Sequence, residues 1–157
     1  MFHNYRFRIN SADERTLTAY LSVKVTWEDK NLNSNAGGGF CLFLGDSYIY
    51  LNMDPETKRI SGIDSEEIRN MEAKSIRLPA VPNCGILTLC EDGDFPEGCG
   101  TRICFRDRIL YDKNQKLLQI GNSIRGGTWV KFLNNAYAQL DRWGHLQTLL
   151  VTNIEVD

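Results

Sequence analysis

Apolar and polar residues alternate with a period of two over much of the chain, a pattern typical of β-strands with one buried face. In Thr18–Glu28 the apolar residues Leu21, Val23, Val25 and Trp27 alternate with polar ones. Similar short apolar runs recur along the rest of the chain. The further predicted strands are Asn4–Ile9, Phe40–Leu44, Ser47–Met53, Lys58–Ile63, Gly85–Cys90, Thr101–Phe105, Arg108–Tyr111, Leu117–Gly121, Thr128–Leu133, Ala136–Leu140 and His145–Val151. Their even spacing predicts a meander, a sandwich or a partly open barrel.

Turn-forming residues separate the predicted strands, and one segment has the pattern of a short helix. Gly45–Asp46 suits a tight hairpin, and Asp54–Thr57 suits a type I turn with proline at its second position. Asp64–Ala73 begins with residues that cap helices and spaces Ile68 and Met71 three apart. We therefore expect a mainly β fold (β-dominated α+β) in a single domain, residues 1–157. It would be a twisted antiparallel sheet, a sandwich or a partly open barrel with one short helix.

Composition and charge narrow the class of protein. The chain has 157 residues, enough for one hydrophobic core, and its 42% hydrophobic and 24% charged residues are typical of a globular domain. The net charge of −2 argues against a general nucleic-acid-binding protein, which would carry a basic surplus. No apolar run approaches the ~20 residues that span a bilayer, and the first residues lack the apolar core of a signal peptide. We expect a cytoplasmic protein that binds neither nucleic acid nor a membrane.

The cysteines do not have the spacing of a metal site. Four of the five follow the pattern C-x5-C-x8-C-x4-C, whereas structural zinc sites use closer pairs so that one tight turn aims both thiolates at the ion. These four are Cys84, Cys90, Cys99 and Cys104. In a reducing compartment the cysteines are expected to be free thiols, and Cys90 and Cys104 lie in apolar runs, where cysteine behaves as a small core residue. We predict no metal and no cofactor.

The sequence contains no recognisable catalytic motif. A serine or cysteine nucleophile needs a histidine base nearby, and the chain has only His3 and His145. Neither histidine lies in a nucleophile elbow of the G-x-S-x-G type. A triad through His145 stays open, because the partners of a triad meet in space rather than in sequence. We predict that the protein is not an enzyme and has no catalytic residues.

The loop Glu91–Glu97 concentrates negative charge between two predicted strands. Its carboxylates do not follow the Asp-x-Asp-x-Asp-Gly spacing of a calcium loop. A pair of carboxylates facing each other across a cleft, as in glycosidases, leaves no signature that the sequence could reveal. Two interpretations of the loop remain, a solvated loop without a binding role and a docking surface for a basic partner. Among the functional roles we favour docking, and we expect Asp92, Asp94 and Glu97 to bind the partner.

Trp143 is the second candidate for a binding role. It lies in the predicted turn Asp141–Gly144, where an exposed tryptophan is costly unless it has a purpose. It would either fold back as a lid on the core or, together with Arg142, anchor a protein interface, since tryptophan and arginine are enriched at interface hot spots. We therefore add Arg142 and Trp143 to the candidate partner-binding residues.

A characteristic order of turns and strand cores runs from Tyr50 to Val151, about two-thirds of the chain. Its pieces are Tyr50–Asp54, Arg59–Gly62, Leu78–Pro79, Gly85–Leu89, Thr101–Ile103, Tyr111–Asp112, Ile120–Gly121, Leu133–Ala136 and Leu140–Leu146. This order resembles small β-rich bacterial immunity proteins of contact-dependent and polymorphic toxin systems. The resemblance implies a monomeric inhibitor that plugs the active site of its cognate toxin through charge complementarity. It assigns no binding residue.

Two functions of different classes follow from these patterns. The first is a non-catalytic binding protein, an immunity protein that neutralises a cognate toxin domain by occluding its active site. The alternative is a small β-barrel carrier or enzyme that acts on a small hydrophobic ligand. The alternative requires an enclosed pocket of at least ~300 Å³ lined by aromatic side chains.

Overall fold

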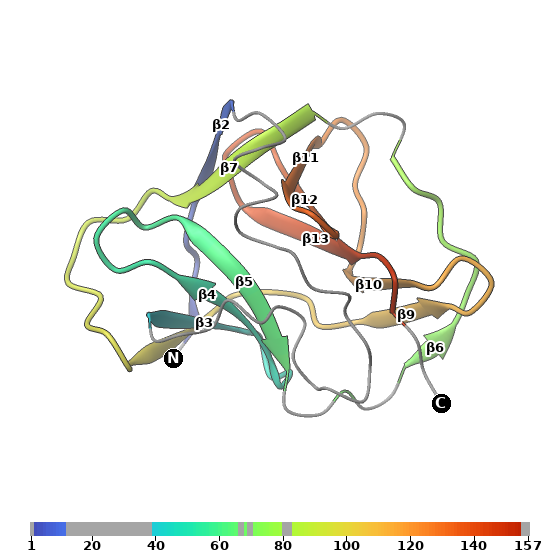
Figure 1. Cartoon of the computed structure of the whole chain (residues 1–157), viewed down its shortest axis with the longest axis horizontal. Coiled ribbons are helices and arrows are strands. Elements are labelled where there is room, and N and C mark those ends of the chain that lie inside the picture. Colours follow the sequence, from blue (N-terminus) through green and yellow to red (C-terminus); the bar gives the residue numbers. More distant parts are fainter. Residues whose placement is uncertain (1, 12–38, 66–67, 69–70, 80–82, 155–157) are drawn as a thin grey trace.

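The computed structural model describes residues 2–11, 39–65, 68, 71–79 and 83–154, and these residues form two mixed β-sheets (Figure 1). Within them there is no helix, and hence none that could cross a membrane. The two sheets do not close into a barrel, and their arrangement is consistent with a β-sandwich. The predicted mainly β fold is confirmed in this respect.

The smaller sheet has five strands and the larger sheet has eight among the described residues. The order in the smaller sheet is β1 (Phe2–His3), β8 (Gly100–Ile103), β3 (Phe40–Leu44), β4 (Ile49–Met53) and β5 (Ile60–Ser65). The order in the larger sheet is β2 (Phe7–Ser11), β7 (Asn83–Leu89), β11 (Thr128–Leu133), β12 (Ala136–Leu140), β13 (Leu146–Val151), β10 (Leu117–Gly121), β9 (Ile109–Asp112) and β6 (Glu72–Ala73).

Neighbouring strands of the chain form antiparallel hairpins, but four pairs of described strands that are distant in sequence run parallel. The hairpins include β3 with β4, β9 with β10 and β11 with β12. The parallel pairs are β1 with β8, β3 with β8, β7 with β11 and β6 with β9. The sheets are therefore mixed rather than purely antiparallel. Hairpin turns leave a local signal in a sequence, whereas a parallel pair is joined by a long connection that leaves none.

One interior receives side chains from both sheets. In β3 the apolar residues Phe40, Leu42 and Leu44 are buried while the two residues between them are half-buried, as in a strand with one face toward the core. Side chains from β4, β12 and β13 complete this interior. Burying one leucine or isoleucine side chain contributes about 1.5–3 kcal/mol. A slip of one residue would turn this whole set outward, so the buried face fixes the register of each strand.

The predicted strands agree closely with the observed ones, but the predicted helix is wrong in the described residues. Phe40–Leu44, Leu117–Gly121, Thr128–Leu133 and Ala136–Leu140 have the predicted bounds. The other predicted strands that are described differ by a few residues at one or both ends, and the two-residue strands β1 and β6 were not predicted. The predicted strand Thr18–Glu28 lies outside the described residues.

The segment expected to be helical, Asp64–Ala73, instead begins inside a strand. Asp64 and Ser65 are the last residues of β5 and are buried, and Asp64 lies opposite Tyr50 of β4. Glu72–Ala73 forms β6. The residues that cap a helix in isolation are thus used in a sheet, because cross-strand pairing outweighs a weak local preference.

Candidate partner-binding surface

The acidic loop between β7 and β8 exposes its carboxylates, while the side chain of Phe95 in its middle is buried. Asp92, Asp94 and Glu97 are all exposed, whereas Phe95 between them is only 8% exposed. The Phe95 ring packs edge-on against the ring of Phe40, with 5.0 Å between the centroids. The three predicted carboxylates therefore project from a loop whose middle is fixed to the core.

The turn between β4 and β5 adds two carboxylates that the sequence reasoning had used only as turn formers. Asp54 Oδ1 accepts hydrogen bonds from the N–H groups of Glu56 (2.8 Å) and Thr57 (3.2 Å), and the Asp54 and Glu56 residues are exposed. The carbonyl of Lys58 accepts a hydrogen bond from Leu89 of β7 (2.9 Å), which ties the turn to the start of the acidic loop. Figure 1 shows both loops at the same end of the molecule, at the left.

Lys58 also stabilises the acidic loop itself. Its ammonium group donates a hydrogen bond to the carbonyl of Glu91 and lies 5.4 Å from the centre of the Phe95 ring. One cation of this end is thus engaged with the loop. We call the set of six carboxylate residues at this end the acidic end. Its members are Asp54, Glu56, Glu91, Asp92, Asp94 and Glu97.

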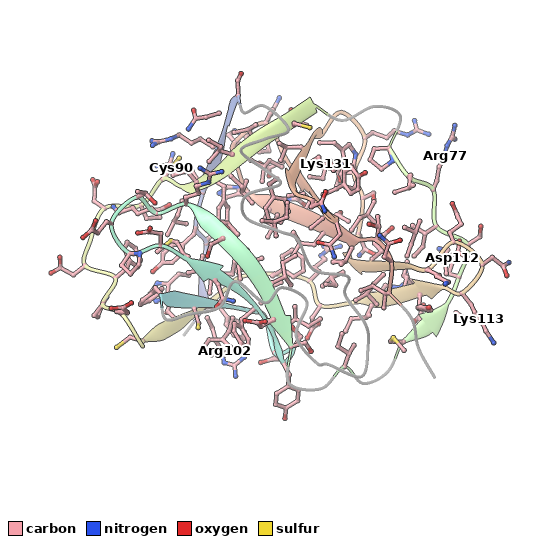
Figure 2. All side chains as sticks on the ribbon, in the orientation of Figure 1. Arg77, Cys90, Arg102, Asp112, Lys113 and Lys131 are labelled. Carbon is pink, nitrogen blue, oxygen red and sulfur yellow. The ribbon has the colours of Figure 1, made fainter. Side chains whose placement is uncertain are left out.

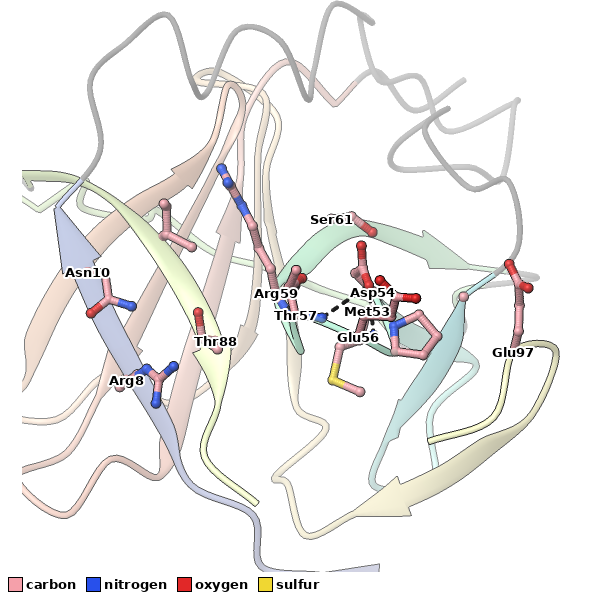
Figure 3. A pocket seen from close by; sticks show the side chains of 13 residues that line it. Arg8, Asn10, Met53, Asp54, Glu56, Thr57, Arg59, Ser61, Thr88 and Glu97 are labelled. Atoms are coloured by element: carbon pink, nitrogen blue, oxygen red, sulfur yellow. Dashed lines mark hydrogen bonds between the residues drawn. The ribbon is translucent and has the colours of Figure 1, made fainter. Parts of the chain in front are cut away.

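A groove of about 710 Å³ runs beside the acidic end. Figure 3 shows Glu97, Asp54 and Glu56 on one side of it and Arg8 on the other, with Arg59 between. Its walls come from both sheets, since Arg8 belongs to β2 and Arg59 immediately precedes β5. The groove therefore carries both signs of charge, with the carboxylates gathered at one side.

The turn between β12 and β13 holds Trp143 away from the core. Trp143 is 60% exposed, and the Arg142 guanidinium lies 4.1 Å from the centre of its ring. Asp141 Oδ1 accepts hydrogen bonds from the N–H groups of Trp143 (2.9 Å) and His145 (2.9 Å). Trp143 is thus an exposed aromatic side chain on a hydrogen-bonded turn and not a lid on the core.

Gly144 fixes this turn against the neighbouring strand. Its carbonyl accepts a hydrogen bond from the N–H of Phe7 (2.7 Å), and its φ of +87° is one that other residues rarely adopt. A Cβ at this position would lie 2.6 Å from the Phe7 carbonyl oxygen. Only glycine therefore lets the turn approach the chain so closely.

The structure brings the two predicted groups of residues to the same short segment of chain. Arg6 donates its N–H to Glu91 Oε1 (3.0 Å), and its carbonyl accepts a hydrogen bond from Cys90 (2.8 Å). Arg6 also forms an isolated β-bridge with His145. The acidic loop and the turn that carries Arg142 and Trp143 thus flank Arg6. Sequence reasoning missed Arg6, Asp54 and Glu56, because no local pattern shows which loops meet.

His145 and Cys104 line one cavity of about 400 Å³. His145 Nδ1 lies 3.3 Å from Asp141 Oδ2, and no hydrogen bond joins Cys104 to His145, both of which are described. Burial acts to raise the pKa of Asp141, but the N–H groups of His145 and Trp143 and the charge of the imidazole outweigh it and lower that pKa. The Asp141 carboxylate therefore orients the imidazole toward the turn.

All five cysteines are free thiols. Cys41, Cys84 and Cys90 are partly buried, whereas Cys99 and Cys104 are exposed. The expectation that Cys104 behaves as a core residue is therefore wrong. It follows directly after β8, on the opposite side of the strand from the buried Ile103.

No protein-family model, no curated protein and no solved structure matches this chain. The role of this surface therefore has to be inferred from its own geometry and charge.

Proposed function

We propose that this protein is a non-catalytic binding protein, an immunity protein that neutralises a cognate bacterial toxin by occluding its active site. The observation that carries the proposal is the exposed Arg142–Trp143 pair on a turn held by Asp141 and Gly144, next to the acidic end. An exposed tryptophan that is fixed before binding loses little freedom on association. Tryptophan and arginine are also the residues that most often dominate the energy of an interface.

The charge of the acidic end favours a partner with a basic surface. It has six carboxylate residues, and the described cations near it are Arg6, Lys58 and the groove residues Arg8 and Arg59. Of these, Arg6 pairs with Glu91 (3.9 Å) and Lys58 is bonded to the acidic loop. A concentrated negative field speeds the encounter with a basic patch and disfavours acidic partners. A basic cleft around a toxin's catalytic residues would meet this condition, and the acidic loop would then block the access of substrate.

The alternative, a carrier or enzyme for a small hydrophobic ligand, fits the observed cavities less well. The groove beside the acidic end is lined by arginine, aspartate, glutamate, asparagine and threonine as well as by Met53 and Ile86. A hydrophobic ligand would have to remove water from these charges, which is costly. A polar protein surface suits such a groove better.

The experiment is a quantitative pull-down from the native host with a tagged chain. The variant D92N/D94N/E97Q removes three charges from the acidic end, and W143A removes the aromatic anchor. The control D46N/D107N removes two exposed carboxylates from elsewhere and leaves the Glu72–Arg108 ion pair intact. We expect one partner to be lost with both test variants and kept with the control. That partner, expressed alone, should arrest growth, and co-expression of the wild-type chain should restore it. Unchanged recovery of every partner would contradict the proposal.

A further inference from the structure

The end of the molecule opposite the acidic end carries a second groove, of about 780 Å³, between β6 and the turn that joins β9 to β10. Met71, Ala73 and Tyr111 supply its apolar lining, and Lys74 and Lys113 supply two exposed cations. Figure 2 shows Lys113 at the right end of the molecule, whereas Cys90, which precedes the acidic loop, lies at the left. We call this cavity the basic groove.

One carboxylate holds the two walls of the basic groove together. Asp112 Oδ2 accepts hydrogen bonds from the N–H of Ile76 (2.9 Å) and from Gln115 Nε2 (2.7 Å). Asp112 Oδ1 accepts hydrogen bonds from the N–H groups of Asn114 (3.0 Å) and Gln115 (3.1 Å). The Ile76 bond and then the Gln115 bonds lower the pKa of Asp112. The walls are therefore set before any ligand arrives.

The two lysines that line the basic groove are its described cations. Lys74 and Lys113 make no ion pair with any described residue. The exposed Arg77 does not line the groove and lies above Asp112 and Lys113 on the right side of Figure 2. Asp112 is the carboxylate that lines the groove, and its two oxygens are already occupied by four donors. By contrast, Glu72 on the neighbouring β6 is neutralised by Arg108 at 2.7 Å.

We propose that the basic groove binds an extended acidic peptide segment of a protein partner. Carboxylates of the peptide would bind Lys74 and Lys113, and an apolar side chain between them would cover Met71 and Ala73. The volume of the groove is larger than an inorganic anion needs, and its mixed apolar and cationic lining suits a chain that alternates both kinds of side chain. Ser75 and Asn114 add side-chain groups that can bond to a peptide backbone. The inference does not depend on the acidic end.

Binding is measured by fluorescence anisotropy of a labelled synthetic peptide of about ten residues that alternates glutamate with leucine. A peptide with lysine in place of each glutamate is the control ligand. We expect the acidic peptide to bind and the basic one not to bind. K74E and K113E should each weaken binding about tenfold, and higher salt should weaken it further. K131E makes the same change of charge on β11, away from the groove, and should leave the affinity within about twofold of wild type (Figure 2).

Three results would overturn the proposal. Equal weakening by K131E and K113E would show that only the overall charge of the protein matters. Equal binding of both peptides would exclude recognition of acidic side chains. If the apparent molecular mass in solution rises with protein concentration and K113E removes this rise, the groove binds a second copy of the chain. The variant D92N/D94N/E97Q should keep peptide affinity, so failure of the inhibitor function and failure of this inference are distinguishable.

Discussion

Two aspartates, Asp141 and Asp112, organise turns at opposite sides of the larger sheet. Both accept hydrogen bonds from backbone N–H groups, but the donors lie at different distances along the chain. Asp141 accepts N–H groups from residues two and four positions further along the chain, so its turn is built from its own sequence neighbourhood. Asp112 does the same for Asn114 and Gln115 but also holds Ile76, which lies 36 residues away. The first arrangement presents a side chain to solvent, and the second joins two segments into the walls of a groove. Local hydrogen bonds shape a loop, whereas the distant bond decides which loops meet.

The largest expected effect breaks the Asp141 turn at its glycine. G144A places a Cβ 2.6 Å from the Phe7 carbonyl at a φ of +87° and should lower the free energy of unfolding by about 2–3 kcal/mol. G98A is the matched control, because Gly98 has a similar φ of +78° with no atom within 4 Å of the added Cβ. It should cost about 1 kcal/mol. Urea unfolding of both variants measures the difference, and equal costs would contradict the close contact with Phe7.

The next prediction compares the two aspartates directly. D141A removes the acceptor of two N–H groups and should cost about 1–2 kcal/mol. D112A should be more destabilising, because it also releases the segment around Ile76 from the turn. Amide hydrogen exchange distinguishes the effects of the two variants. D112A should speed exchange at Ile76, Asn114 and Gln115, and D141A should speed it at Trp143 and His145. Accelerated exchange at Ile76 in D141A would argue against two independent turns.

The same two carboxylates predict how stability depends on pH. Both have a pKa below the usual value of 3.8, so both contribute stability that is complete above this value. Below it the unfolded chain binds protons before the folded one does, and the free energy of unfolding falls as the pH is lowered further. D112N and D141N should each flatten this fall, since an amide does not titrate. Urea unfolding between pH 3 and about pH 6 measures the slope, and an unchanged slope in both variants would refute the assignment.

The smallest expected effect on stability belongs to the residue with the largest expected effect on binding. Trp143 is 60% exposed, so W143A should change the free energy of unfolding by less than about 0.5 kcal/mol. On the proposed function, the same variant should weaken binding of the partner by about 2 kcal/mol or more, because it removes an aromatic anchor. Thermal unfolding and titration of the purified partner measure the two quantities. A large loss of stability would show that the Trp143 side chain stabilises the fold, which would contradict a role in binding alone.

Strand positions could be predicted well because they rest on a local signal. Four strands have the expected bounds, and each shows apolar residues at a period of two or as a short buried run. The helix predicted for Asp64–Ala73 was wrong for the opposite reason. Its capping residues favour a helix locally, but Asp64 lies opposite Tyr50 in a sheet, and the energy of that pairing comes from a strand elsewhere in the chain.

The sequence by itself determined the β class, most strand positions, the acidic loop and the turn that carries Trp143, since all of these depend on neighbours within a few positions. Tertiary structure alone decided the parallel pairs, the meeting of the acidic loop with the Trp143 turn at Arg6, and the joining of Ile76 to Asp112. The physical reason is that a hydrogen bond or a packed contact between distant residues has no period and no local composition. It exists only when the buried faces of both sheets have fixed the path of the chain.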